Sequence, residues 1–122
     1  MEGGITLKAH TVIDAGTCGF RTTVAADSPD SRHVAFAIET GCAVVGDLVA
    51  ALEERQPIDV YGEIDKRKES VILATVLETL AECRKSCAVP LGIFKAMQVV
   101  TGLALPKDVH IEVVADKGDT EA

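Results

Sequence analysis

Three stretches in the first third of the chain alternate between apolar and polar residues. The alternation covers residues 5–12, 20–26 and 34–38, and the turn residues at 27–31 separate the second stretch from the third. A period of two is typical of strands that bury one face. The pattern therefore predicts three antiparallel strands connected as a hairpin or meander.

After the third stretch, the apolar residues are spaced as in an amphipathic helix. Apolar side chains between residues 44 and 52 repeat at helical intervals, and Gln56-Pro57 ends the stretch because proline cannot continue a helix. The segment 58–69 that follows has no clear period, so we expect a connection with at most a short element.

Two further helices are predicted in the second half of the chain. Ser70 is a suitable N-cap for a helix whose apolar stripe runs from residue 71 to residue 80. Pro90 suits the first turn of a last helix, whose apolar stripe ends near Gly102. Residues 109–113 alternate again and predict a last short strand.

These elements together predict an α+β fold, with an antiparallel sheet of three to four strands and three helices. A chain of 122 residues is the size of one ordinary domain with a single core. We expect that domain to cover residues 1–116 and to be followed by a polar tail at 117–122.

Composition and charge exclude several classes of protein. The formal net charge of −7 and the absence of tryptophan argue against nucleic-acid binding, and the basic run at 66–68 is flanked by acids, as in a solvated turn. The N-terminus has no basic region followed by an apolar stretch, and no apolar run approaches the roughly 18 residues of a membrane span. A cytoplasmic protein without membrane contact is expected.

Three of the four cysteines fall at the ends of predicted elements. Cys18 stands between glycines, Cys42 follows Gly41 where the third strand meets the first helix, and Cys87 precedes the last helix. A helix N-terminus favours thiolate over thiol, and thiolate is the form that binds soft metals and attacks sulfur. Free cysteine is also a common small core residue, but that role is more usual in the middle of an element.

Cys83 lies four residues before Cys87 and forms a looser pair with it. The spacing fits a metal chelate only weakly, so Cys83 is equally a fourth ligand or a bystander. The neighbouring Arg84 and Lys85 would favour thiolates at either sulfur. No phosphate-binding glycine loop, catalytic serine pattern or helical zinc-protease motif is present, so conventional hydrolase or nucleotide chemistry has no support.

The order of these motifs resembles the U-type iron–sulfur cluster scaffold family (NifU/IscU-like). The resemblance covers about residues 16–101 and rests on Cys18-Gly19 before a strand, Gly41-Cys42-Ala43 entering a helix, and Cys87 before a helix containing Lys95-Ala96. It implies an α+β domain with the helices packed on one face of the sheet. Parts of the chain, among them residues 16–20 and 102–108, also look like a small prokaryotic group without an assigned function, which would be a divergent branch of this family.

The resemblance implies that Cys18, Cys42 and Cys87 converge to hold an iron–sulfur cluster or a zinc ion. Gly19, Gly41 and Lys85 would shape that site, and a cysteine desulfurase or an iron–sulfur acceptor protein would be the partner. The chain differs from the family at two positions: Phe20 replaces an acidic residue, and Ser86 replaces the histidine that usually precedes the third cysteine.

Three functions remain open at this point. The leading hypothesis is a non-catalytic protein that binds a metal or an iron–sulfur cluster through Cys18, Cys42 and Cys87, with Cys83 as a candidate fourth ligand. The second is a persulfide-transfer or thiol-redox protein that uses Cys87 or Cys42. The third is an interaction module with structural cysteines, which forms a homodimer through an exposed strand edge.

Overall fold

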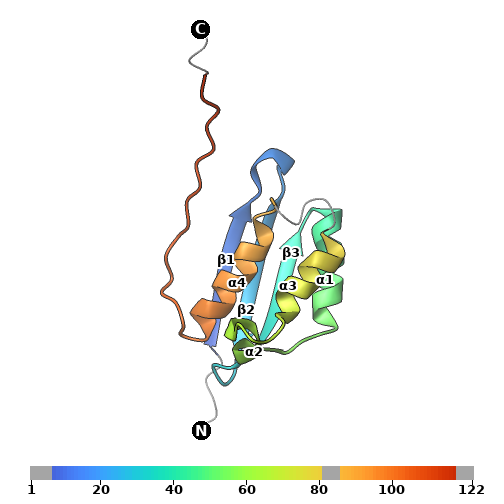
Figure 1. The fold of residues 1–122 in the computed structure, drawn as a ribbon, viewed down its shortest axis with the longest axis vertical. Helices are drawn as coiled ribbons and strands as arrows, with labels where there is room; N and C mark the ends of the chain where they lie inside the picture. The colour runs from blue at the N-terminus through green and yellow to red at the C-terminus, as the bar shows by residue number, and fades with distance from the viewer. Residues whose placement is uncertain (1–6, 81–85, 118–122) are drawn as a thin grey trace.

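The computed structural model of the chain describes residues 7–80 and 86–117 (Figure 1). Four strands form one sheet in the order β1-β2-β3-β4. They are β1 (Leu7–Asp14), β2 (Arg21–Ser28), β3 (His33–Thr40) and the short β4 (Ile58–Asp59). All neighbouring pairs are antiparallel, so the predicted meander of the first three strands is confirmed.

Alternation along the strands separates a covered face of the sheet from an open one. In β2 every second residue from Thr22 to Ser28 is buried, whereas the residues between them are partly exposed. Register places Val24 between Thr11 of β1 and Ile38 of β3, so these side chains share the covered face. The opposite face carries polar and small residues such as His10 and Thr23, and no helix covers it in Figure 1.

The helices lie together on the covered face (Figure 1). They are α1 (Ala43–Glu53), the single-turn α2 (Val60–Ile64), α3 (Val71–Thr79) and α4 (Val89–Val100). The three longer helices occupy the predicted stretches, and α2 with β4 forms the short structure within the expected connection. The α+β architecture with helices on one face is thus as predicted. No helix within the described ranges is both long and apolar enough to cross a membrane.

One apolar core joins the helices to the sheet. Leu48 of α1, Ile72 of α3 and Ile93 of α4 are fully buried against Val24 and Val34 of the sheet. Ser70 caps α3 as predicted, because its hydroxyl accepts a hydrogen bond from the N–H of Leu73 at 2.9 Å.

The strand predicted at residues 109–113 is not formed. Residues 105–117 are exposed and have no regular secondary structure, and Figure 1 shows them running outside the sheet and helices. The fourth strand is β4 instead. Alternation predicts that a segment can form a strand, but a strand also needs a neighbouring edge with which to pair its backbone groups.

Candidate functional site

Cys18 lies in the loop that joins β1 to β2. The loop contains a short 3-10 turn, Gly16–Cys18, and closes with a 3.0 Å hydrogen bond from the N–H of Ala15 to the carbonyl of Phe20. Gly16 and Gly19 have φ values of 75° and 74°, which glycine adopts without a steric cost. The glycines that flank Cys18 therefore build the tight loop, and the Cys18 side chain is exposed at its end.

Cys42 is the N-cap residue of α1. Its backbone is extended (φ −89°, ψ 123°), and its side chain makes no capping hydrogen bond to the helix. The N–H of Cys42 donates to the Thr40 hydroxyl at 3.2 Å, and that hydroxyl shares a 2.8 Å hydrogen bond with the Thr22 hydroxyl. This backbone anchor fixes Cys42 beside the first-turn N–H groups of α1.

Cys87 lies just before α4. The helix begins at Val89 with Ala88 as its N-cap residue, and Pro90 occupies the first turn as predicted. Cys87 is half-buried and packs against the apolar core, as does Cys42. The two residues enter different helices, but both helices begin at the same end of the sheet.

The three cysteines predicted from the sequence line one cavity. Its volume is about 80 Å³. Cys18 reaches it from the β1–β2 loop, Cys42 from the start of α1 and Cys87 from the approach to α4. The other lining residues are mostly apolar: Ala15, Phe20, Thr22, Val44, Val45, Leu80, Ser86 and Val89. A thiol in such surroundings is shielded on several sides while Cys18 keeps contact with solvent.

The side chains are not arranged as a preformed metal centre. Within residues 7–80 and 86–117, no three Cys, His, Asp or Glu side chains are grouped closely enough to hold an ion. The donor set itself suits a soft metal, because three thiols face one small cavity. Cys83 and Lys85, a candidate ligand and a candidate site-shaping residue, lie outside the described residues.

The two positions that differ from the resembled family both line the cavity. Phe20 and Ser86 are on its surface, next in sequence to Gly19 and Cys87. Gly41 approaches Phe20 closely: a Cβ at Gly41 would lie 3.3 Å from Cδ1 of the ring. Gly41 thus lets the β3–α1 junction pack beside the β1–β2 loop, which brings the Cys42 and Cys18 segments to one place.

Two features of the site were missed in the sequence. The first is the Thr22–Thr40 pair beneath Cys42, which is recognisable only once the register of β2 and β3 is known. The second is the apolar lining from Val44 and Leu80. Val44 belongs to the apolar pattern of α1 and is 36% exposed, and because it lines the cavity, the apolar stripe of the helix extends beyond the core to this site.

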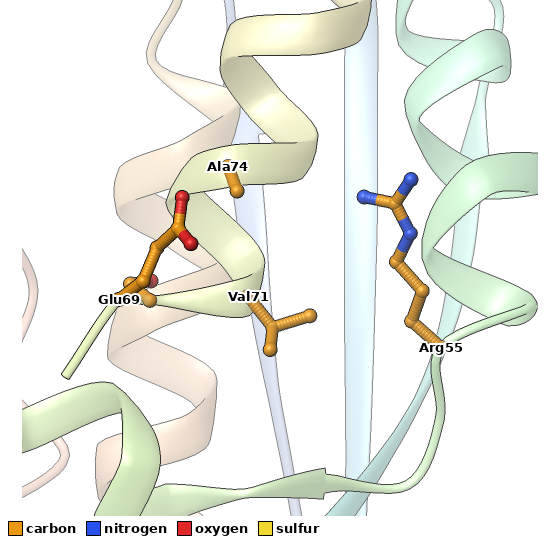
Figure 2. A pocket seen from close by; sticks show the side chains of 5 residues that line it. Arg55, Glu69, Val71 and Ala74 are labelled. Atoms are coloured by element: carbon orange, nitrogen blue, oxygen red, sulfur yellow. The ribbon is translucent and has the colours of Figure 1, made fainter.

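A second, more open cavity of about 310 Å³ lies at the other end of α1 and α3 (Figure 2). Figure 2 shows Arg55 extending from the end of α1 toward the helix that carries Val71 and Ala74. The Arg55 guanidinium donates to the Thr75 hydroxyl and, at 2.7 Å, to the Glu78 carboxylate. The cation is thus already paired, which makes this cavity a poor anion site.

The N-terminus of α3, beside the same cavity, is also satisfied from within the chain. The Glu63 carboxylate accepts from the N–H groups of Val71 at 2.8 Å and Ile72 at 3.1 Å, and it also accepts from the Ser70 hydroxyl. The Ser70 hydroxyl in turn accepts a hydrogen bond from the N–H of Leu73. The cysteine-lined cavity is therefore the better candidate for a functional site.

The fold and the site define a small α+β domain with a cavity lined by three thiols. The sequence profile of one family matches residues 9–113, and the chain belongs to that family, described as a family of unknown function (DUF6951). No curated protein and no solved structure matches the chain. The match includes all the cysteines and extends beyond α4 to Val113.

Proposed function

We propose that this protein binds a soft metal ion or an iron–sulfur cluster through Cys18, Cys42 and Cys87. The observation that carries the proposal is the meeting of three thiols, from three separate segments, at one small cavity. Thiolates are the ligands of zinc and of iron–sulfur clusters. The proposed role is non-catalytic and cytoplasmic, since thiols stay reduced in that compartment.

The surroundings of the cysteines support this role in two ways. Cys42 is placed at the N-terminus of α1, a helix with no acidic residue in its first turn, so the dipole acts on the sulfur without an opposing carboxylate. The rest of the cavity lining is mostly apolar, and apolar surroundings of low dielectric strengthen the attraction between thiolates and a cation. Both effects would favour the metal ion bound in the cavity over the hydrated ion in solution.

Binding requires side-chain rearrangement, because the described residues contain no group already set around an ion. Cys18 is exposed on its loop, so rotation about its side-chain bonds meets little resistance. Cys83, four positions before Cys87, is the proposed fourth ligand. A tetrahedral set of four sulfurs is the usual arrangement of structural zinc and of many iron–sulfur centres.

The proposal is tested by metal titration of single-residue variants. We expect Cys42→Ser to lose most of the zinc, or iron and sulfide, that the wild-type chain takes up. The matched control is Ala43→Ser, which adds the same hydroxyl at an exposed neighbouring position and removes no sulfur. Equal metal content in Cys42→Ser and the wild type, with both folded by circular dichroism, would show that the proposal is wrong. Cys83→Ser separately tests the fourth ligand.

A second candidate function is sulfur transfer through a persulfide. It is favoured by the absence of a preformed metal group among the described residues and by the position of Cys42 beside the α1 N-terminus. A transferred sulfur atom needs one reactive thiolate, not a converging set. Mass spectrometry of metal-free protein after incubation with a cysteine desulfurase and cysteine separates the two functions. An added sulfur on one cysteine supports transfer, and its absence removes this candidate.

A further inference from the structure

We propose that residues 108–114 of one chain add as a strand to the outer edge of β1 in a second copy. The exchange is reciprocal, so two chains form a two-fold symmetric dimer. This contact does not involve the cysteine cavity, because it uses the segment beyond α4 and the free edge of β1, which is the edge that does not pair with β2. It also explains why a segment with a strand pattern has no strand partner among the described residues of its own chain.

The first observation is an edge of the sheet that pairs with nothing in the described part of the chain. β1 is an eight-residue strand at the end of the order β1-β2-β3-β4, and among the described residues it pairs with β2. α4 packs on the face of β1, not on its outer edge (Figure 1). An uncovered edge presents a row of backbone donors and acceptors, which is a template for another strand.

The segment that would pair with this edge is exposed and makes no backbone hydrogen bonds to the domain among the described residues. Backbone hydrogen bonds hold the chain as far as Ala104, whose N–H donates to the carbonyl of Gln98 at 3.2 Å. Among the described residues, no backbone hydrogen bond joins 108–117 to the rest of the domain. Ile111 is 67% exposed and Val113 is 90% exposed. Exposed β-branched residues in alternation with polar ones are typical of a strand that buries one face.

The segment and the edge fit each other in length and apolar pattern. The seven residues of the segment match most of the eight in β1. When Ile111 and its apolar neighbours lie on the helix-covered face, the face to which Ile13 belongs, the residues between them fall on the open face. A shift of one residue would turn the apolar side chains of the segment to the open face.

A second copy of the chain gives both chains a pairing partner, because each copy has a free β1 edge and a segment that can pair with it. Figure 1 shows the segment running outside the sheet and helices, and among the described residues none of its backbone groups is hydrogen-bonded to β1. In a reciprocal exchange each copy gives one segment and receives one, which is the self-complementary contact of a two-fold dimer. The family match runs through this segment to Val113, so the segment is part of the sequence that the family shares.

The test is the oligomeric state of the full chain by analytical ultracentrifugation over a range of concentrations. We expect a dimer whose dissociation constant rises at least about tenfold in Ile111→Pro, because proline removes a backbone donor and is excluded from paired strands. Ile111→Lys should act in the same direction by placing a charge on the covered face. Asp116→Pro, beyond the exchanged segment, is the matched control and should leave the dimer intact.

Hydrogen exchange of the same samples separates the remaining outcomes. We expect the amides of residues 109–113 to be protected in the dimer and to lose protection on dilution. A monomer with rapidly exchanging amides would overturn the proposal. A monomer with protected amides would show pairing with the chain's own β1, and a dimer unaffected by either Ile111 variant would show another interface. Each of these results contradicts strand exchange, and unchanged circular dichroism confirms that the variants fold.

Discussion

Gly41 and the ring of Phe20 are in such close contact that a side chain at residue 41 would press on the ring. A Cβ there would lie 3.3 Å from Phe20 Cδ1. Phe20 follows the Cys18 loop and Gly41 precedes Cys42, so this contact joins the two segments that carry these cysteines. The cavity depends on it because Phe20 is part of the cavity lining.

Substituting Gly41→Ala is expected to open the cavity without unfolding the domain. Phe20 is 42% exposed and its ring has room to shift, so we expect the free energy of unfolding to change by less than about 1 kcal/mol. The shifted ring should expose Cys42, and its alkylation rate should rise severalfold, as measured by mass spectrometry of the labelled peptide. In Gly46→Ala the new Cβ meets nothing within 4 Å, so this control should leave the rate unchanged.

Gly92→Ala is expected to destabilise the domain. Its Cβ would lie 2.7 Å from Ile13 Cγ1 and closer still to Ile13 Cδ1, and Gly92 also accepts a 2.9 Å hydrogen bond from the Thr11 hydroxyl. Because the Ile13 side chain or α4 itself must shift to make room for the Cβ, we expect a loss of about 1–3 kcal/mol in urea unfolding. In the background of Ile13→Ala the same substitution should cost much less. Additive losses would show that the contact is not the cause.

Glu63 is expected to stabilise α3 through its carboxylate. The carboxylate accepts two backbone N–H groups of the first helical turn, so Glu63→Ala should leave them without a protein acceptor and cost about 1–3 kcal/mol. Glu63→Gln keeps a neutral acceptor and should cost less. Urea unfolding measures both, and Glu69→Ala, at an exposed neighbouring residue, is the control. Equal losses in Glu63→Ala and Glu69→Ala would contradict the capping role.

The turn between β2 and β3 is expected to make stability depend on acid pH. The N–H and ring of His33, with the N–H of Arg32, hold the pKa of Asp30 well below its usual range. The Arg32 guanidinium lowers the pKa of Asp59 in the same way. A carboxyl with a lowered pKa stabilises the fold above its unfolded pKa of about 3.9, and the stabilisation is lost as pH falls toward the folded pKa.

Urea unfolding between about pH 2 and pH 6 measures this effect. The free energy of unfolding should fall with decreasing pH below about 4, and it should fall less steeply in Asp30→Asn because the amide does not titrate. Asp116→Asn, in the exposed segment beyond α4, should keep the wild-type slope. Identical slopes in Asp30→Asn and the wild type would show that the turn does not contribute.

Local periodicity was sufficient to predict most of the fold. The strands and the three longer helices follow from side chains that repeat at two residues or at helical spacing, and the Ser70 cap follows from its place before an apolar stripe. The prediction of a strand at residues 109–113 was wrong for a physical reason. Its alternation resembles that of β2, but β2 has a partner on both edges and residues 109–113 have none among the described residues.

The site was predictable to the extent that it depends on element ends. Cys18, Cys42 and Cys87 were selected because each stands where an element begins or a loop turns, and the sheet brings those ends together at one cavity. The partners that hold them were not predictable. The Thr22–Thr40 hydrogen bond requires the register of two strands, and the Glu63 cap of α3 requires a contact between separate helices.

The most direct test of the thiol site is the zinc, iron and acid-labile sulfide content of the full chain purified without oxygen, measured together with its visible absorption spectrum. We expect about one zinc ion, or iron and sulfide in cluster proportions, bound per site, and a thiolate-to-iron absorption band if iron is present. Protein that holds no metal after purification and takes up none on reconstitution with zinc or with iron and sulfide would contradict a metal-binding role for Cys18, Cys42 and Cys87.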